Sequence, residues 1–94
     1  MSWEMAFKQW RERPYPSRSS IVGTVDPVLL DADLVAQLEK LQRGGDAFVV
    51  FELARMRDAI VKVLPHLHGD GLSYFIEAVE VADLALAERT QGHD

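Results

Sequence analysis

The side chains best suited to chemistry lie in the stretch PHLHGDG, which holds two histidines and an aspartate. His66, His68 and Asp70 are acceptable ligands for a zinc-like cation. An extended backbone would place both imidazoles on one side, whereas a helix would separate them by about 200°. The competing interpretation is a loop, in which histidines near a helix C-terminus complement its dipole and Gly-Asp-Gly forms a turn. We favour the loop and keep these three residues as weak metal candidates, with His93 a further imidazole.

A second group of chemically capable side chains consists of carboxylates. Glu77 and Glu80 share a helical face at i,i+3, and Glu88 lies two turns further on. Helical metal-binding bundles repeat Glu-x-x-His on two helices, and no such repeat occurs here. The glycine pair at 44–45 lacks the Lys-Ser/Thr of a phosphate loop, and no nucleophile motif surrounds the serines at 17, 19 and 20. The sequence therefore predicts no catalytic residue and no cofactor, and it favours a protein that is not an enzyme.

The composition limits the class of protein and its compartment. The chain has 94 residues, of which 48% are hydrophobic, and it has no cysteine. This length supports one domain with one core, and the lack of thiols fits a reducing compartment. No apolar run approaches the roughly 20 residues of a membrane span, and the N-terminus lacks the pattern of a secretory signal. We expect a cytoplasmic protein.

The net charge of −5 is distributed unevenly along the chain. Residues 1–24 carry four basic and two acidic side chains, whereas residues 25–94 carry six basic and thirteen acidic ones. Proteins that bind nucleic acid derive much of their affinity from neutralising phosphates with Lys and Arg. An acidic body with so few cations therefore argues against a nucleic-acid partner.

Three long segments have the periodicity of helices, and they lie at roughly 27–43, 47–64 and 72–89. The first begins after Asp26, a good N-cap, with Pro27 at its first position, and it ends at the glycines 44–45. The second begins after Asp46 and ends near Pro65. The third has an apolar face wide enough to contact more than one neighbouring helix or another chain. The first helix presents a leucine stripe at Leu30, Leu34, Leu38 and Leu41.

An alternative takes residues 21–25 and 47–51 as parallel strands around a crossover helix, because both runs are β-branched or aromatic. That fold would require a strand to enter a helix at Glu52 without a connecting loop, which disfavours it. We therefore predict an all-α fold. It is a small antiparallel three-helix bundle (26–94) preceded by a short N-terminal amphipathic helix and an irregular strap rich in Pro, Arg and Ser (1–25), in one domain spanning 1–94.

The N-terminal segment contains the candidate partner-binding residues. Trp3, Phe7 and Trp10 are spaced i, i+4 and i+7, so a helix over 2–12 would place them on one face. A helix this short is marginal alone, so its own body, a second copy, a partner or a membrane surface must cover the indoles. Tyr15 is flanked by two prolines, and we expect the strap to lay it and its arginines on the acidic helices. The functional interpretation is a contact surface of Trp3, Phe7, Trp10, Arg11, Arg13 and Tyr15.

The leading hypothesis is a non-enzymatic acidic helical protein that binds a protein partner, as an adapter, inhibitor or immunity-type module does, or that self-associates as a dimer. An alternative contact surface for a basic target consists of Glu77, Glu80, Asp83 and Glu88. A second hypothesis is a metal-binding protein or metal-dependent enzyme that uses His66, His68 and Asp70. A third is peripheral membrane attachment through the indole face. We disfavour it, because the body is acidic and only three cations lie nearby.

Overall fold

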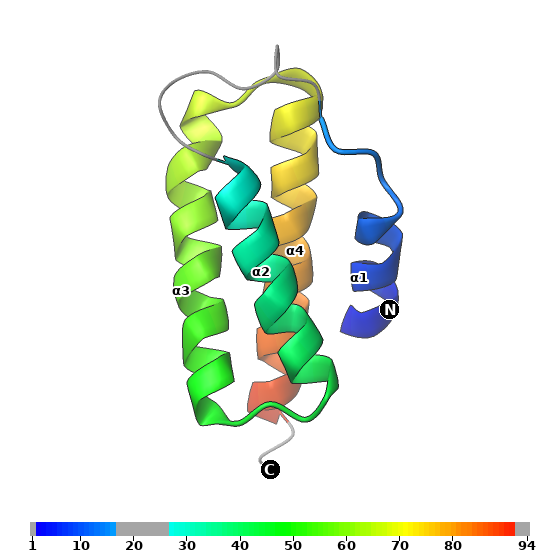
Figure 1. Cartoon of the computed structure of the whole chain (residues 1–94), viewed down its shortest axis with the longest axis vertical. Coiled ribbons are helices and arrows are strands. Elements are labelled where there is room, and N and C mark those ends of the chain that lie inside the picture. The colour runs from blue at the N-terminus through cyan, green and yellow to red at the C-terminus, as the bar shows by residue number, and fades with distance from the viewer. Residues whose placement is uncertain (1, 17–26, 92–94) are drawn as a thin grey trace.

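The computed structural model of the chain describes residues 2–16 and 27–91, and every helix within them is an α-helix except one short 3₁₀ turn (Figure 1). No β-strand occurs within these residues, so the protein is all-α as predicted. The strand alternative is wrong at 47–51, which lies inside a helix, and its other half at 21–25 lies outside the described residues. The elements are α1 (Trp3–Arg11), α2 (Pro27–Gln42), α3 (Ala47–Val63), η2 (Leu64–His66) and α4 (Gly69–Gln91).

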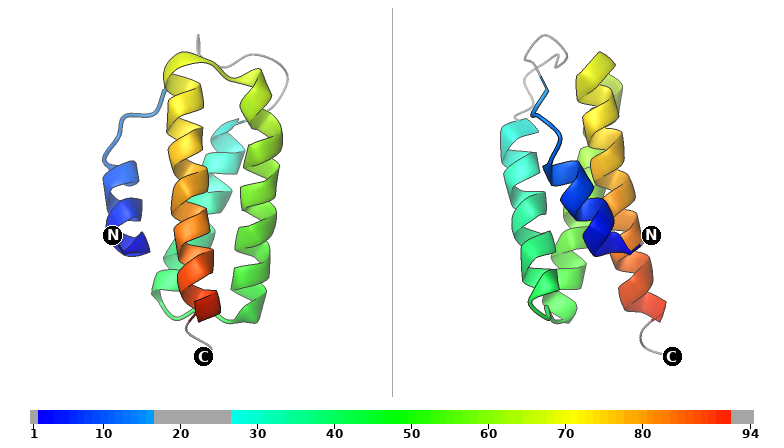
Figure 2. Two further views of the ribbon diagram at one scale, coloured as in Figure 1. Left: turned by 180° about the vertical axis from the view of Figure 1, so that it is seen from behind. Right: turned by 90° about the vertical axis from the view of Figure 1, so that its right-hand side faces the viewer.

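The helix α4 lies between two neighbours. It packs against α3 on one side and against α1 on the other, while α2 packs against α3 (Figures 1 and 2). Successive helices α2, α3 and α4 run in alternating directions along the longest dimension of the molecule, which is 43 Å. The wide apolar face predicted for α4 thus contacts two helices, α3 and α1.

The turn between α2 and α3 follows directly from its residues. Gly44 has a φ of +92°, a left-handed conformation that favours glycine, and its N–H donates to the carbonyl of Leu41 at 3.0 Å. The side chain of Asp46 then accepts a hydrogen bond of 3.2 Å from the N–H of Val49, which makes it the N-cap of α3 as predicted. The Asp26 cap proposed for α2 lies outside the described residues, although α2 begins at Pro27.

The core is built from apolar stripes of all four helices. In α2, the side chains of Leu34, Leu38 and Leu41 are buried, and Leu30 packs against them, which confirms the leucine stripe. From the other helices, the largest fully buried side chains are those of Trp10, Leu53, Ile60, Phe75 and Val81. The core therefore depends on α1 as well as on α2, α3 and α4.

The start of α4 differs from the prediction. The helix begins at Gly69 rather than at Leu72, and the N–H of Leu72 donates to the carbonyl of His68. Gly69 reaches this position with a φ of +55°, and Asp70 falls in the first turn, where a negative charge complements the helix dipole. Only Leu67 and His68 link η2 to α4, and the turn that the loop interpretation expected at Gly-Asp-Gly is instead the first turn of α4.

Candidate partner-binding surfaces

The three aromatic rings of α1 face inwards. Trp3 and Phe7 are each 5% exposed and Trp10 is fully buried, because their spacing puts them on one side of a helix that packs on α4. Their ring centroids follow one another at 6.2 Å and 6.3 Å, from Trp3 to Phe7 and from Phe7 to Trp10. The sequence left open whether the chain itself, a second copy, a partner or a membrane covers the indoles. In the structure, the helices of the same chain cover them.

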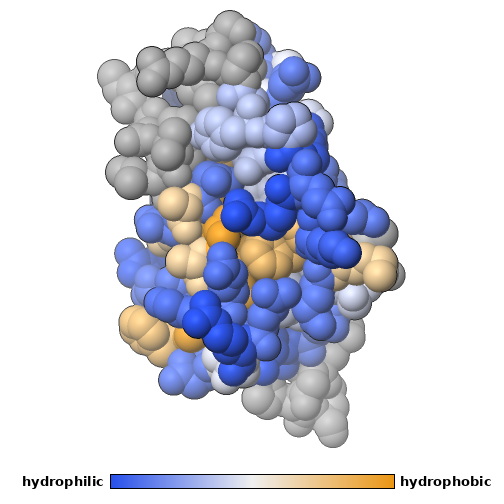
Figure 3. Space-filling model, turned by 45° about the vertical axis from the view of Figure 1, so that its right-hand side comes forward, coloured by the Kyte–Doolittle hydropathy of each residue, from blue (hydrophilic) through white to orange (hydrophobic). Residues whose placement is uncertain are grey.

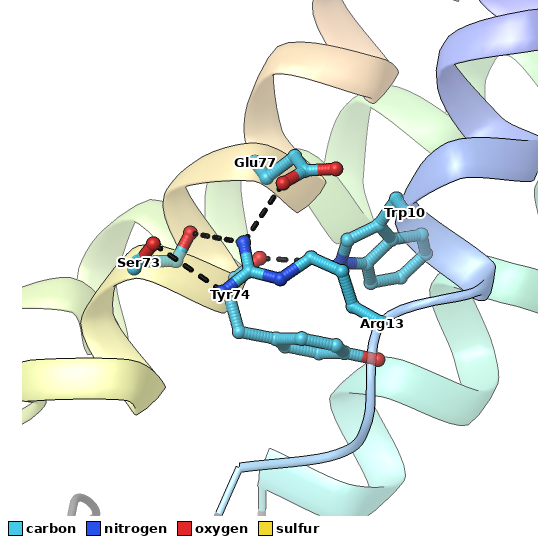
Figure 4. Close-up of polar contacts among 5 residues, drawn as sticks. All are labelled: Trp10, Arg13, Ser73, Tyr74 and Glu77. Carbon is cyan, nitrogen blue, oxygen red and sulfur yellow. Dashed lines mark hydrogen bonds and ion pairs between the residues drawn. The ribbon is translucent and has the colours of Figure 1, made fainter.

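Trp10 is fixed to α4 by its indole nitrogen as well as by its ring. Its Nε1–H donates a hydrogen bond of 3.2 Å to the backbone carbonyl of Tyr74 (Figure 4). The centroids of the Trp10 and Tyr74 rings are 5.2 Å apart, and Tyr74 also contacts Phe75 edge to face at 5.1 Å. A buried indole N–H needs such a partner, and here the helix backbone provides it.

Arg13 holds the segment after α1 to the same part of α4. Its guanidinium forms an ion pair of 2.8 Å with Glu77 and reaches the carbonyl and the hydroxyl of Ser73, each at 3.4 Å (Figure 4). The same group lies 5.7 Å from the centroid of the Tyr74 ring, within the range of a cation–π contact. The expectation that a basic residue of this segment would lie on an acidic helix is confirmed for Arg13.

The hydroxyl of Tyr74 connects α4 to α2. It donates a hydrogen bond of 2.7 Å to Oδ1 of Asp31, and its ring is only 4% exposed. Burial raises the pKa of Tyr74 well above its usual value, and the hydrogen bond and charge of Asp31 raise it further, while the charge of Arg11 acts in the opposite direction. Tyr15 lies on this cluster as expected, with its ring 5.5 Å from that of Tyr74, and it keeps 41% of its surface exposed.

The acidic surface predicted on α4 is largely engaged within the chain. Glu77 pairs with Arg13, and Glu88 accepts a hydrogen bond of 2.8 Å from the backbone N–H of Trp3 at the start of α1. Asp83 pairs with Arg57 of α3 at 2.9 Å. Glu80 is exposed and has no polar partner among the described residues. Three of the four carboxylates therefore connect α4 to other parts of the chain.

The metal candidates are not arranged as a ligand set. His66, His68 and Asp70 are all exposed, and His66 belongs to the 3₁₀ turn while Asp70 belongs to α4. Within residues 2–16 and 27–91, no three His, Cys, Asp or Glu side chains are placed to hold a metal ion. His93 lies outside the described residues.

Two phenylalanines that the sequence interpretation did not single out are the most exposed of the large apolar side chains described. Phe48 is 68% exposed and Phe51 is 61% exposed, and both lie at the start of α3. Their spacing of three residues puts them on one side of the helix, together with the exposed Arg55. The signal was present in the sequence, because both rings fall outside the apolar stripe of α3, on which Leu53 is buried and Val49 packs against the core.

An open hollow of about 430 Å³ lies between α1 and α2. Figure 3 shows the molecule from the side of α1, with apolar side chains near the centre and hydrophilic ones around them. Arg11, the one partner-binding candidate on α1 that is exposed, lines the hollow. We call it the α1–α2 hollow, and its other lining residues come from α2 and the turn that follows it: Asp31, Ala32, Val35, Ala36, Glu39, Lys40 and Arg43.

Comparisons with known proteins provide no relative from which a role can be transferred. No protein-family model, curated protein or solved structure matches the chain. A search of the helices in the described part of the chain finds none that is long and apolar enough to cross a membrane.

Proposed function

We propose that the protein is a non-enzymatic protein-binding module, and that it contacts its partner through Phe48 and Phe51 on the outer side of α3. The observation that carries the proposal is the exposure of these two rings in a chain that buries both of its tryptophans. In this proposal α2, α3 and α4 form the antiparallel three-helix bundle that presents the rings, and α1 with the segment after it completes its core.

The energetics favour burial of the two rings by a partner. Full burial of a phenylalanine side chain contributes about 1.5–3 kcal/mol, and both rings keep most of their surface exposed. Charged side chains lie beside the two rings. Glu52 follows Phe51 directly in α3, and it forms an ion pair of 3.4 Å with Arg55, one turn further along the helix. An apolar centre edged by charged groups is the usual composition of a protein–protein contact.

Purified protein and a matched pair of variants can test the proposal. Phe48→Ser/Phe51→Ser removes the exposed rings, and Ile76→Ser/Leu84→Ser removes the two less exposed apolar side chains of α4. Circular dichroism first checks that both variants keep the helical content of the wild type. Light scattering after size exclusion then reports a second copy, and capture with quantitative mass spectrometry reports another protein. We expect the Phe48/Phe51 variant to lose the partner or the dimer, and the α4 variant to keep it.

The result that would contradict this proposal is an α3 variant that folds normally and retains every partner and the same mass as the wild type. A dimer that depends on both rings would identify the partner as a second copy. A monomer that captures the same protein reproducibly, and loses it only when the rings are removed, would identify an adapter or inhibitor.

The other functions considered from the sequence have less support from the described geometry. A basic target on α4 would have to compete with Arg13, Arg57 and the N–H of Trp3 for three of the four carboxylates. Membrane attachment would use the indole face of α1, which is turned towards α4. A metal-binding role would need His66, His68 and Asp70 to converge from separate elements.

A further inference from the structure

The α1–α2 hollow combines an apolar floor with cations on both walls. Ala32, Val35 and Ala36 provide the apolar part of its lining, and the two alanines are exposed. Arg11 comes from α1, whereas Lys40 comes from α2 and Arg43 from the turn directly after it. This is an unusual composition for a chain whose net charge is −5, because the charged side chains that line the hollow include more cations than anions.

The carboxylates of the hollow are already engaged, but two of its cations are not. Asp31 accepts a hydrogen bond of 2.7 Å from the hydroxyl of Tyr74, and Glu39 forms an ion pair of 3.7 Å with Arg43. Among the described residues, no carboxylate pairs with Arg11 or Lys40. Two unpaired positive charges on opposite walls therefore remain available for an anionic ligand.

The length of the hollow indicates an elongated ligand. Its lining residues on α2 extend from Asp31 to Lys40, a rise of about 14 Å along a helix, and Arg43 lies in the turn beyond. Arg11 lies near the Asp31 end, because it follows Trp10, whose ring contacts the Tyr74 ring, and the Tyr74 hydroxyl binds Asp31. Lys40 lies nine residues further along α2. The two cations are thus separated along the groove by more than two helical turns.

We propose that this hollow binds an acidic amphipathic helix of a protein partner. The apolar stripe of that helix would lie on Ala32, Val35 and Ala36, where the small side chains allow a close approach. Carboxylates on its two flanks, about two turns apart, would pair with Arg11 and Lys40. The proposal deepens the protein-binding function by naming one kind of partner, and it uses a surface that does not include Phe48 or Phe51.

The test is a titration of the full ¹⁵N-labelled chain with a synthetic helix of about 14 residues. The peptide has leucines in one stripe and glutamates on both flanks, and a twin peptide replaces every glutamate with lysine. For the glutamate peptide, we expect the largest changes in amide chemical shift at residues 32–40 and at Arg11. We expect the lysine twin to bind at least about tenfold more weakly. Raising the salt concentration should weaken the glutamate complex.

Charge reversal in the protein provides the matched controls. Arg11→Glu/Lys40→Glu should reduce affinity for the glutamate peptide by about tenfold or more and increase affinity for the lysine twin. Lys62→Glu, at an exposed position of α3 outside the hollow, makes the same change of net charge as Lys40→Glu alone and should leave both affinities unchanged. Ala36→Gln, at an exposed position, fills the hollow without a charge and should weaken binding while the fold is retained.

Several outcomes would overturn the proposal. They are equal affinity for the two peptides, shift changes centred away from residues 32–40, and no binding of the glutamate peptide at millimolar concentration. Tighter binding of dodecanoate at the same residues would identify a small carboxylate amphiphile instead. A concentration-dependent doubling of mass that shifts the same resonances without peptide would identify a second copy. The Phe48→Ser/Phe51→Ser variant should still bind the glutamate peptide, which separates this test from that of the protein-binding function.

Discussion

The indole N–H of Trp10 donates to the backbone carbonyl of Tyr74 at 3.2 Å, and the two rings lie with their centroids 5.2 Å apart. One fully buried side chain thus joins α1 to α4 across 64 residues of sequence, through both a polar and an apolar contact. The surrounding contacts of Arg13 and Asp31 converge on the same tyrosine. This tyrosine is therefore the residue through which α1, α2 and α4 are held together.

Substitution of Trp10 should separate the two contributions of its side chain. Trp10→Phe keeps most of the ring but removes the donor, and we expect it to lower the free energy of unfolding by about 1–2 kcal/mol. Trp10→Ala also leaves a cavity and should cost about 3–5 kcal/mol. Urea unfolding followed by circular dichroism measures both values. A loss from Trp10→Ala no greater than that from Trp10→Phe would contradict the buried position of the ring.

The intrinsic fluorescence of the protein should report buried indoles. Both tryptophans are nearly or fully buried, at 5% exposure for Trp3 and 0% for Trp10. We expect emission at short wavelength and weak quenching by acrylamide in a dilute sample, with a red shift on unfolding. Trp3→Phe and Trp10→Phe assign the signal to each residue. Emission like that of free indole in water, from a folded sample, would show that α1 does not pack on α4 in solution.

The stability of the protein should fall in alkaline solution because of Tyr74. Its pKa is raised in the folded state, chiefly by burial, so the folded chain keeps the phenolic proton at a pH where the unfolded chain has lost it. The stabilisation is complete below the unfolded value near 10 and decreases as the pH rises above it. Urea midpoints measured between pH 9 and 11 should decline more steeply for the wild type than for Tyr74→Phe, with Tyr15→Phe as the control. Parallel declines in all three proteins would contradict this assignment.

The ion pair between Arg13 and Glu77 should make a small, salt-sensitive contribution. Both side chains are about one-third exposed, so a double-mutant cycle with alanine should give a coupling of about 0.5–1 kcal/mol that decreases at high salt. Arg13→Lys should not restore the full value, because an ammonium cannot reach Glu77, Ser73 and the Tyr74 ring in the same way. A coupling that is unchanged at high salt would argue against an ionic origin.

The fold was predictable where local patterns decide it. The leucine stripe of α2, the caps at Gly44 and Asp46 and the amphipathic spacing of α1 all depend on residues a few positions apart, and the structure places them as expected. The start of α4 was placed three residues late, because glycine at 69 was interpreted as a turn residue only. In the structure, its left-handed conformation directs the chain into the helix.

The candidate surfaces were less predictable, because they depend on which helices become neighbours. A run of carboxylates on α4 has the appearance of a free acidic face until Arg13, Arg57 and the start of α1 are placed against it. The hollow lined by Arg11 and Lys40 likewise requires two helices that are separate in the sequence. Phe48 and Phe51 were different, since their position outside the apolar stripe of α3 was already visible.

The hydrogen bond between Trp3 and Glu88 has a consequence for how the chain folds during its synthesis. These residues are 85 positions apart, so α1 leaves the ribosome long before the surface that covers it exists. The apolar side of α1 cannot pack on α4 until most of α4 has left the ribosome, and until then it is exposed to water or bound to another surface. Although α1 is made before α2, α3 and α4, it is therefore among the last to dock, and contacts this distant in sequence slow the final step of folding.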